Sequence, residues 1–170
     1  MPVRFLKNGT LHITIVPPWY TDNLIALKQT LHTMEKPKKV TLTFSEIDFG
    51  PKRRNPRLIW ITGLKSKLLQ EAQKKFERVL GVTPEKRPLL PHITIARLLL
   101  RQTQDSARPS TGRYPARQAR PGKKQSTFQK SKIHWKCTIK TFCLMESRLK
   151  RTGAVYRVLH TYLFSTHTRG

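Results

Sequence analysis

The sequence predicts an α+β fold in one domain that spans residues 1–170. Three observations indicate this fold: several short segments alternate apolar and polar residues as strands do, two longer segments carry helical apolar stripes, and one tetrapeptide occurs twice. His-Ile-Thr-Ile stands at 12–15 and again at 92–95. This separation suits an internal duplication in which each half of the chain forms one wall of a cleft.

The first half of the chain predicts a strand, a helix and two further strands. Residues 11–16 alternate and are expected to form a strand that prolines then end. Thr21 or Asp22 is expected to cap the helix, because both side chains can accept a backbone hydrogen bond. Two more strands are expected at 40–44 and 57–62. The apolar positions of the helix are Leu24, Ile25, Leu27 and Leu31.

The second half begins with the strongest helix pattern. Ser66 is expected to cap this helix, which ends near Leu80 because Gly81 suits the left-handed residue after a helix. A strand over residues 91–100 carries the second tetrapeptide. The apolar stripe of the helix is Leu68, Leu69, Ala72, Phe76, Val79 and Leu80.

A compositional change marks residues 101–132, which carry nine Lys and Arg against one acid and few large apolar residues. Such a segment cannot bury enough surface to offset its ordering entropy, so a flexible basic loop is expected there. Two strands follow, at about 133–140 and 155–164, and are expected to pair as an antiparallel hairpin.

The charge balance indicates the class of molecule that the protein binds. The chain has 34 Lys and Arg against 9 Asp and Glu, a formal net charge of +25. Folding needs no such excess, which opposes compaction by self-repulsion, and the usual cause is a polyanion such as nucleic acid. No apolar run reaches transmembrane length and no signal-peptide core is present, so no membrane partner is expected. The two cysteines, Cys137 and Cys143, fit no zinc pattern and are expected to be free thiols in a reducing cytoplasm.

Each tetrapeptide offers a specific pair of side chains. On a strand, His12 and Thr14 would lie on one face about 6.6 Å apart, with apolar residues behind them, and the same holds for His92 and Thr94. A lone strand histidine is usually structural, but a matched repeat of both residue types argues against coincidence. Two imidazoles and two hydroxyls in one cleft would suit phosphoryl chemistry without a metal.

These motifs resemble the two-histidine (2H) phosphoesterases, and within them the RNA 2′,3′-cyclic phosphodiesterase branch, also called 2′-5′ RNA ligase (LigT-like). The resemblance implies a bilobal α+β fold, in which two antiparallel sheets form a central cleft and helices lie outside. It also implies a hydrolase for RNA 2′,3′-cyclic phosphate ends that uses no metal and no cofactor. The segments that carry the resemblance, besides the two His-x-Thr motifs, are Phe49-Gly50-Pro51, residues 57–61, Arg87–Leu98 and residues 144–157 with Glu146-Ser147-Arg148, Gly153 and Tyr156-Arg157.

The resemblance implies a role for each motif residue. His12 and His92 would be the acid and base, and since an ordinary histidine pKa is near ~6.5, one neutral and one protonated imidazole can coexist near neutral pH. The sequence does not assign which is which. Thr14 and Thr94 would donate to the phosphate oxygens, and Arg97 would contact phosphate. On a regular strand, however, Arg97 falls on the face opposite His92, so a solvated arginine is the alternative.

The chain departs from the family before the first motif. Family members usually have a strand and a helix there, whereas eleven residues precede His12. A missing strand is expected to expose a sheet edge in the first lobe. Residues 16–19 (Val-Pro-Pro-Trp) also stand where bacterial relatives often have an arginine.

Two other classes of function stay open from the sequence. One is a non-catalytic RNA-binding protein with the same fold. The other is a 2H phosphodiesterase for a small cyclic nucleotide or for 2′-5′ oligoadenylate. The net charge favours a polymer, so the expected partner is RNA with 2′,3′-cyclic phosphate ends, such as tRNA fragments, bound by a monomer.

Overall fold

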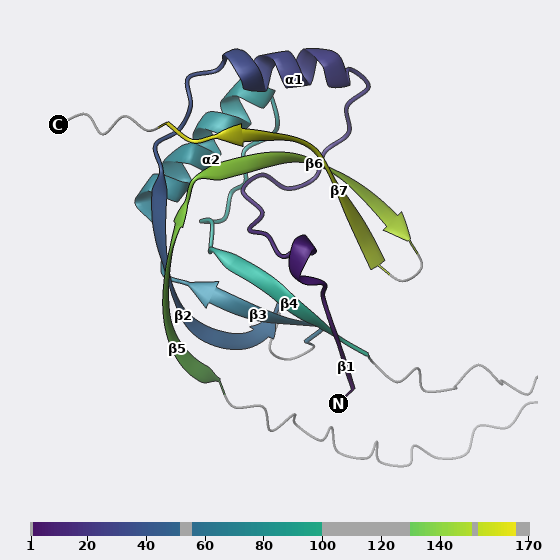
Figure 1. The fold of residues 1–170 in the computed structure, drawn as a ribbon, viewed down its shortest axis with the longest axis vertical. Coiled ribbons are helices and arrows are strands. Elements are labelled where there is room, and N and C mark those ends of the chain that lie inside the picture. The colour runs from purple at the N-terminus through teal and green to yellow at the C-terminus, as the bar shows by residue number, and fades with distance from the viewer. Residues whose placement is uncertain (1, 52–55, 100–129, 151–152, 166–170) are drawn as a thin grey trace, which may run out of the picture.

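The computed structural model describes residues 2–51, 56–99, 130–150 and 153–165 (Figure 1). Most of the basic segment expected at 101–132 lies outside these ranges. The described elements are β1 (Val3–Phe5), the 3-10 helix η1 (Asn8–Thr10), α1 (Leu24–Thr33), β2 (Val40–Gly50), β3 (Leu58–Gly63), α2 (Lys67–Leu80), β4 (His92–Leu98), β5 (Ser131–Ile139), β6 (Thr141–Lys150) and β7 (Gly153–Leu163).

The strands form two antiparallel sheets. The larger sheet has the order β1-β4-β3-β2-β5, and β6 pairs with β7 in a two-stranded sheet. Figure 1 shows the larger sheet curled, with α1 and α2 on one side of the β6–β7 pair and the segment between η1 and α1 on the other. The predicted α+β class with two antiparallel sheets is confirmed.

Helix α2 packs against both sheets and contributes to both cores. Leu69 is fully buried in the cluster that includes Val40, Leu42 and Phe44 of β2. One and two turns later, Ala72 and Phe76 belong to the cluster formed with β6, β7 and α1. A single helix therefore fixes the larger sheet relative to the smaller one.

The ends of α2 follow the prediction. The Ser66 hydroxyl accepts a hydrogen bond from the backbone N–H of Leu69 at 3.3 Å, and Gly81 adopts the left-handed conformation with φ 63°. The predicted stripe is wrong at Leu68, which is 46% exposed. The predicted cap of α1 is also wrong, because Asn23, rather than Thr21 or Asp22, accepts the N–H of Ala26 at 2.9 Å.

Two strand predictions require correction. Residues 11–16 form no strand, because they have no ladder partner and are held by side-chain packing instead. Lys140 also separates two strands, β5 and β6. The predicted strand at 133–140 therefore corresponds to β5, which ends at Ile139 and pairs with β2. The hairpin partner of β7 is β6, a separate strand that the sequence pattern did not resolve from β5.

Candidate active site

His92 begins β4, which lies between β1 and β3. Its ring nitrogen Nδ1 lies 2.9 Å from the carbonyl oxygen of Leu90. The indole of Trp60 stacks on the imidazole, with ring centroids 4.0 Å apart and planes inclined by 29°. The ring is thus held by a hydrogen bond at one edge and by an aromatic face.

His12 lies in the unpaired segment after η1, yet its ring is held in a similar way. Its Nδ1 lies 2.8 Å from the carbonyl oxygen of Thr10. The ring of Tyr156, from β7, makes a T-shaped contact with the imidazole at a centroid distance of 4.7 Å. The first motif is therefore anchored to the small sheet.

Both histidines share one hydrogen-bonding pattern, in which Nδ1 meets the carbonyl two residues upstream. A carbonyl oxygen can only accept, so Nδ1 must carry the proton in each ring. The free nitrogen is then Nε2, which accepts a proton when the ring is neutral and donates one when the ring is charged. In both rings the nitrogen that is not held by the backbone is therefore Nε2.

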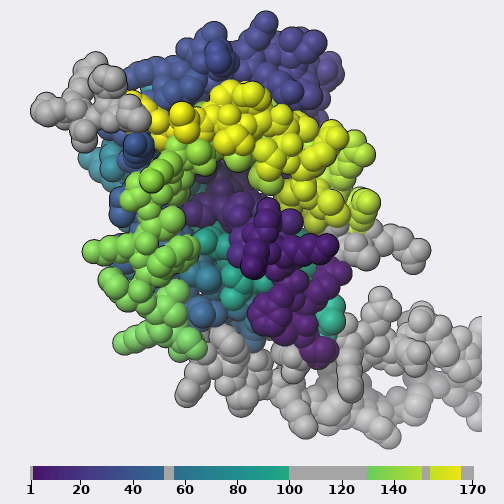
Figure 2. All heavy atoms as spheres, in the orientation of Figure 1, coloured from purple at the N-terminus to yellow at the C-terminus, as the bar shows by residue number. Residues whose placement is uncertain are grey.

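Apolar side chains of the two His-x-Thr motifs pack on the same core. Ile13 and Ile93 both contact the buried cluster around Leu42 and Phe44. Figure 2 shows the molecule hollowed between β5, β7 and the N-terminal residues, with atoms coloured as the segment after η1 and as β4 deep in the hollow. The fold therefore brings together two motifs that are 80 residues apart in the sequence (92 − 12).

The side chains of Thr14 and Thr94 are half-buried. Neither hydroxyl makes a hydrogen bond with another residue in the described ranges. Thr94 is directly opposite Trp60 on β3, one row along the sheet from the pair formed by His92 and Thr62. It thus lies on the same face of the sheet as His92, and its hydroxyl can donate to a bound anion.

Arg97 also lies on the face of the larger sheet that carries His92, here called the His92 face. Trp60 pairs with Thr94 whereas the preceding residue of β3 pairs with Ala96, so β4 carries one extra residue, Ile95, at a β-bulge. A bulge shifts the alternation of side chains by one. The register then places Arg97 opposite Leu58, in line with Thr94 and His92.

The sequence did not single out Trp60 or Tyr156 as contacts of the histidines. Trp60 is half-buried, and its Nε1 is buried without a hydrogen-bond partner among the described residues. Gly50 lies against this indole, and a side chain at that position would overlap the ring. The available signal was the segment Phe49-Gly50-Pro51 close before a tryptophan-bearing strand.

Among the described strands of the larger sheet, β2 is the one that brings acidic groups to the His92 face. Lys130 contacts Glu46 at 2.7 Å and Asp48 at 3.5 Å. The hydrogen bond to Glu46 is the largest cause that raises the pKa of Lys130 above its ordinary value. A bound anion would therefore be favoured on the β4 side of this face and disfavoured over β2.

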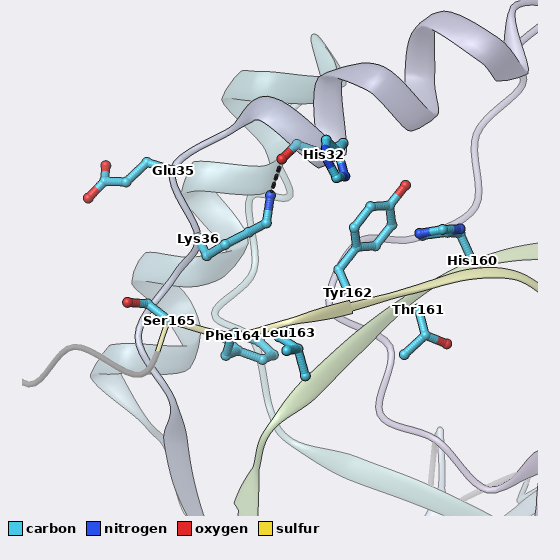
Figure 3. Close-up of a pocket in the computed structure, with 9 residues that line it drawn as sticks. All are labelled: His32, Glu35, Lys36, His160, Thr161, Tyr162, Leu163, Phe164 and Ser165. Atoms are coloured by element: carbon cyan, nitrogen blue, oxygen red, sulfur yellow. Dashed lines mark hydrogen bonds between the residues drawn. The ribbon is translucent and has the colours of Figure 1, made fainter.

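A pocket of about 530 Å³ lies elsewhere, between the end of α1 and β7 (Figure 3). Two of its polar side chains are hydrogen-bonded to backbone carbonyls of α1. Lys36 donates to the carbonyls of Leu31 and His32 at 2.7 and 2.6 Å, and the Tyr162 hydroxyl donates to the carbonyl of Lys28 at 3.2 Å. It contains neither motif. Its lining residues are His32, Glu35, Lys36, His160, Thr161, Tyr162, Leu163, Phe164 and Ser165.

The described ranges contain no group of three or more His, Cys, Asp or Glu side chains placed to hold a metal ion. In the same part of the chain, no helix is both long enough and apolar enough to span a membrane.

Comparison with known proteins identifies related sequences and folds. The profile of the 2′-5′ RNA ligase superfamily matches residues 4–151. The protein TT0787 of Thermus thermophilus has a TM-score of 0.61 and 18% identity, over 97% of this chain and 84% of that one. E. coli LigT complexed with 3′-AMP has a TM-score of 0.54 and 20% identity, over 96% and 82% of the two chains. Its complex with phosphate has a TM-score of 0.57 and 18% identity, over 96% and 80%. No curated protein sequence matches the chain.

Proposed function

This chain belongs to the 2′-5′ RNA ligase superfamily, and from that premise we propose that it is an RNA 2′,3′-cyclic phosphodiesterase. It opens the cyclic phosphate at an RNA 3′ end and leaves a 2′-phosphate. The observation that carries the proposal is the shared anchoring of His12 and His92, each through Nδ1 to a carbonyl two residues upstream.

The proposed reaction uses the two free Nε2 atoms. One neutral imidazole removes a proton from water, and the oxygen of that water forms a bond to phosphorus. The bond from phosphorus to the ribose 3′ oxygen breaks, and the protonated imidazole gives its proton to that oxygen. The same pair can also join two RNA ends: one imidazole removes the proton of a 5′-hydroxyl in place of water, that oxygen bonds to phosphorus, and the other imidazole protonates the departing 3′ oxygen, which leaves a 2′-5′ linkage.

The remaining motif residues are proposed to bind the phosphate. Thr14 and Thr94 donate from their hydroxyls to the non-bridging oxygens, where negative charge grows in the transition state. Arg97 is proposed as a phosphate contact on the face that carries His92 and Thr94. No metal ion and no cofactor take part in the proposed reaction.

Two further observations support an RNA substrate. E. coli LigT, which shares the fold, has been crystallised with 3′-AMP and with phosphate. The net charge of +25 exceeds what a small nucleotide would need, because a mononucleotide requires only a local positive site. We propose that the protein acts as a monomer in the cytoplasm, in one domain over 1–170, on RNA such as tRNA fragments.

The test uses an oligonucleotide that ends in a 2′,3′-cyclic phosphate, with EDTA present. Wild-type protein is expected to convert the cyclic end to a 2′-phosphate. His12→Ala and His92→Ala are each expected to lower kcat by about 10²–10⁴-fold, the usual contribution of an acid or base. Exposed His134→Ala is the matched control.

Three outcomes would contradict parts of the proposal. Tight RNA binding without turnover would indicate a non-catalytic binding protein. Turnover of a cyclic mononucleotide or a 2′-5′ oligoadenylate alone would indicate another substrate. Activity abolished by EDTA would overturn the metal-free mechanism.

A further inference from the structure

Strand β5 is an edge strand of the larger sheet and borders the hollow that Figure 2 shows. Its core-side residues determine which way its lysines point. Trp135 stacks on buried Phe44 at a centroid distance of 4.9 Å, and Cys137 packs on the same apolar cluster. Side chains alternate between the two faces along a strand, so Lys136, which lies between these two residues, belongs to the His92 face.

Lys132 also belongs to the His92 face and lies in the same row of the sheet as His92. The row runs from His92 on β4 through Thr62 on β3 and Glu46 on β2 to Lys132 on β5. Directly opposite residues of an antiparallel pair share a face, so the whole row faces the hollow. The backbones of its two ends are three strand spacings apart, about 14 Å.

The charges along β2 and β5 differ in sign. Lys130 contacts Glu46 at 2.7 Å and Asp48 at 3.5 Å, so one lysine offsets one of two carboxylate charges over β2. The exposed side chains of Lys132 and Lys136 make no ion pair or hydrogen bond within the described ranges. An anion is therefore disfavoured over β2 and favoured on either side of it, at β4 and at β5.

We propose that Lys132 and Lys136 bind internal phosphodiesters of an RNA strand whose 3′-terminal cyclic phosphate lies at His92. The uncharged ribose and base of the terminal nucleotide then lie over β2, between phosphates held at β4 and at β5. This inference rests on the proposed function and adds a preference for oligonucleotide ends over mononucleotides.

The spacing along β5 assigns a different phosphodiester to each lysine. Four residues separate the two positions (136 − 132), about 13 Å along the strand. Two ammonium groups carried by backbone this far apart suit two phosphates of a chain better than one. Lys132 lies in the His92 row and therefore contacts the phosphodiester nearer to the cyclic end, and Lys136 contacts one farther from it.

Protection of the sheet edge is the structural alternative, because lysines on an edge strand also hinder pairing with another chain. That role does not require the lysines to share a face with His92. It also leaves the other face of β5 unexplained, where Trp135 is 45% exposed. Edge protection alone predicts that removal of both lysines causes self-association and leaves the affinity for RNA unchanged.

The binding test uses a fluorescent RNA hexanucleotide that ends in a 2′-phosphate, titrated at several salt concentrations. Each phosphate contact contributes about 0.7 to the slope of log affinity against log salt for a single strand. Lys132→Gln and Lys136→Gln are each expected to lower that slope by about 0.7, and the double variant by about 1.4. Each single change is expected to weaken affinity by about two- to fivefold, the scale of an exposed ion pair.

Two matched variants control for charge and for position. Lys132→Arg keeps the positive charge and is expected to keep the slope. Lys74→Gln removes an exposed lysine from α2, which packs against the other face of the sheet, and is also expected to keep it. Sedimentation of the double variant measures self-association. Self-association with an unchanged slope would overturn the inference in favour of edge protection.

The kinetic test compares a cyclic-ended hexanucleotide with the corresponding cyclic mononucleotide. Lys132→Gln is expected to lower the ratio of hexanucleotide to mononucleotide kcat/KM by about two- to fivefold. An unchanged ratio together with an unchanged salt slope would overturn the inference. An equal fall for both substrates would also overturn it, because Lys132 would then act on the reacting phosphate. If wild-type protein turned over neither substrate, the proposed function would fail, while the salt slopes would still test the two lysines.

Discussion

Gly50 lies against the indole of Trp60 so closely that any side chain at position 50 would overlap the ring. The same indole stacks on His92 at a centroid distance of 4.0 Å. The three residues come from adjacent strands β2, β3 and β4, so the position of the second histidine depends on a glycine two strands away.

The first prediction follows from this stack. Gly50→Ala is expected to displace Trp60 and with it His92. An overpacked position typically costs about 1–3 kcal/mol in the free energy of unfolding, and a misplacement near ~1 Å can lower kcat by about 10²-fold. Chemical denaturation and turnover of cyclic-ended RNA measure the two effects. Gly9→Ala is the matched control, because a Cβ there meets nothing within 4 Å; equal activity of both variants would contradict the prediction.

The second prediction concerns Trp60 itself. Trp60→Phe keeps an aromatic face against His92 and removes the buried Nε1 that has no partner among the described residues. Its kcat is expected to stay within a few-fold of wild type, whereas Trp60→Leu is expected to lose more, because an aromatic pair contributes about 0.5–1.5 kcal/mol beyond burial. Single-turnover rates of the two variants provide the comparison, and a Leu variant as active as the Phe variant would refute the role of the stack.

The third prediction concerns Tyr156. His12 lies in a segment without strand pairing, so its ring depends on side-chain contacts more than that of His92 does. Tyr156→Phe is expected to retain activity, while Tyr156→Ala is expected to lower kcat by about tenfold, the equivalent of about 1.4 kcal/mol. Tyr20→Ala removes a fully exposed tyrosine and is expected to match wild type. Loss of activity in the Phe variant would instead implicate the hydroxyl.

The fourth prediction concerns pH. Glu146 is paired with Arg148 at 2.8 Å and with Arg157 at 3.0 Å, and the hydrogen bond from Arg148 is the largest cause that lowers the pKa of this carboxyl below its usual value of 4.5. A lowered pKa in the folded state gives stability that is present above the unfolded pKa and is lost as the pH falls through the folded pKa. Wild type is therefore expected to have a higher Tm than Glu146→Gln near neutral pH. This difference is expected to disappear as the pH is lowered below about 4.5.

The control for this experiment is Glu71→Gln, since Glu71 is exposed on α2 and has no ion pair within the described part of the chain. Its effect on Tm is expected to be small at every pH. A Glu146→Gln difference that grew on acidification would reverse the sign of the argument.

Local signals in the sequence were sufficient for some elements and not for others. The caps of α2 depend on Ser66 and Gly81, which act within a few residues of the helix ends, and were therefore predictable. The face of Arg97 depends on a bulge in the pairing of β4 with β3, which no pattern within β4 reveals. For His12, alternation predicted a strand, but a strand also needs a partner ladder, and residues 11–16 have none.

Only some features around the histidines were likewise predictable from local sequence. Each His-x-Thr motif was evident from its residues, and the packing of Ile13 and Ile93 on one cluster follows from apolar alternation. The rings of Trp60 and Tyr156 reach the histidines through cross-strand register and through the docking of the small sheet. Both depend on long-range packing, so the sequence alone could not place them.

The hydrogen bonds at Nδ1 have a consequence for how the protein tolerates mutation. Each imidazole is oriented by a main-chain carbonyl, at Thr10 and at Leu90, and not by an acidic side chain. Every amino acid supplies that carbonyl, so the residues at positions 10 and 90 can be replaced without removing the group that fixes the protonated nitrogen. The orientation of both histidines therefore depends on the path of the backbone. Sequence variation at positions 10 and 90 does not indicate that the site has been lost.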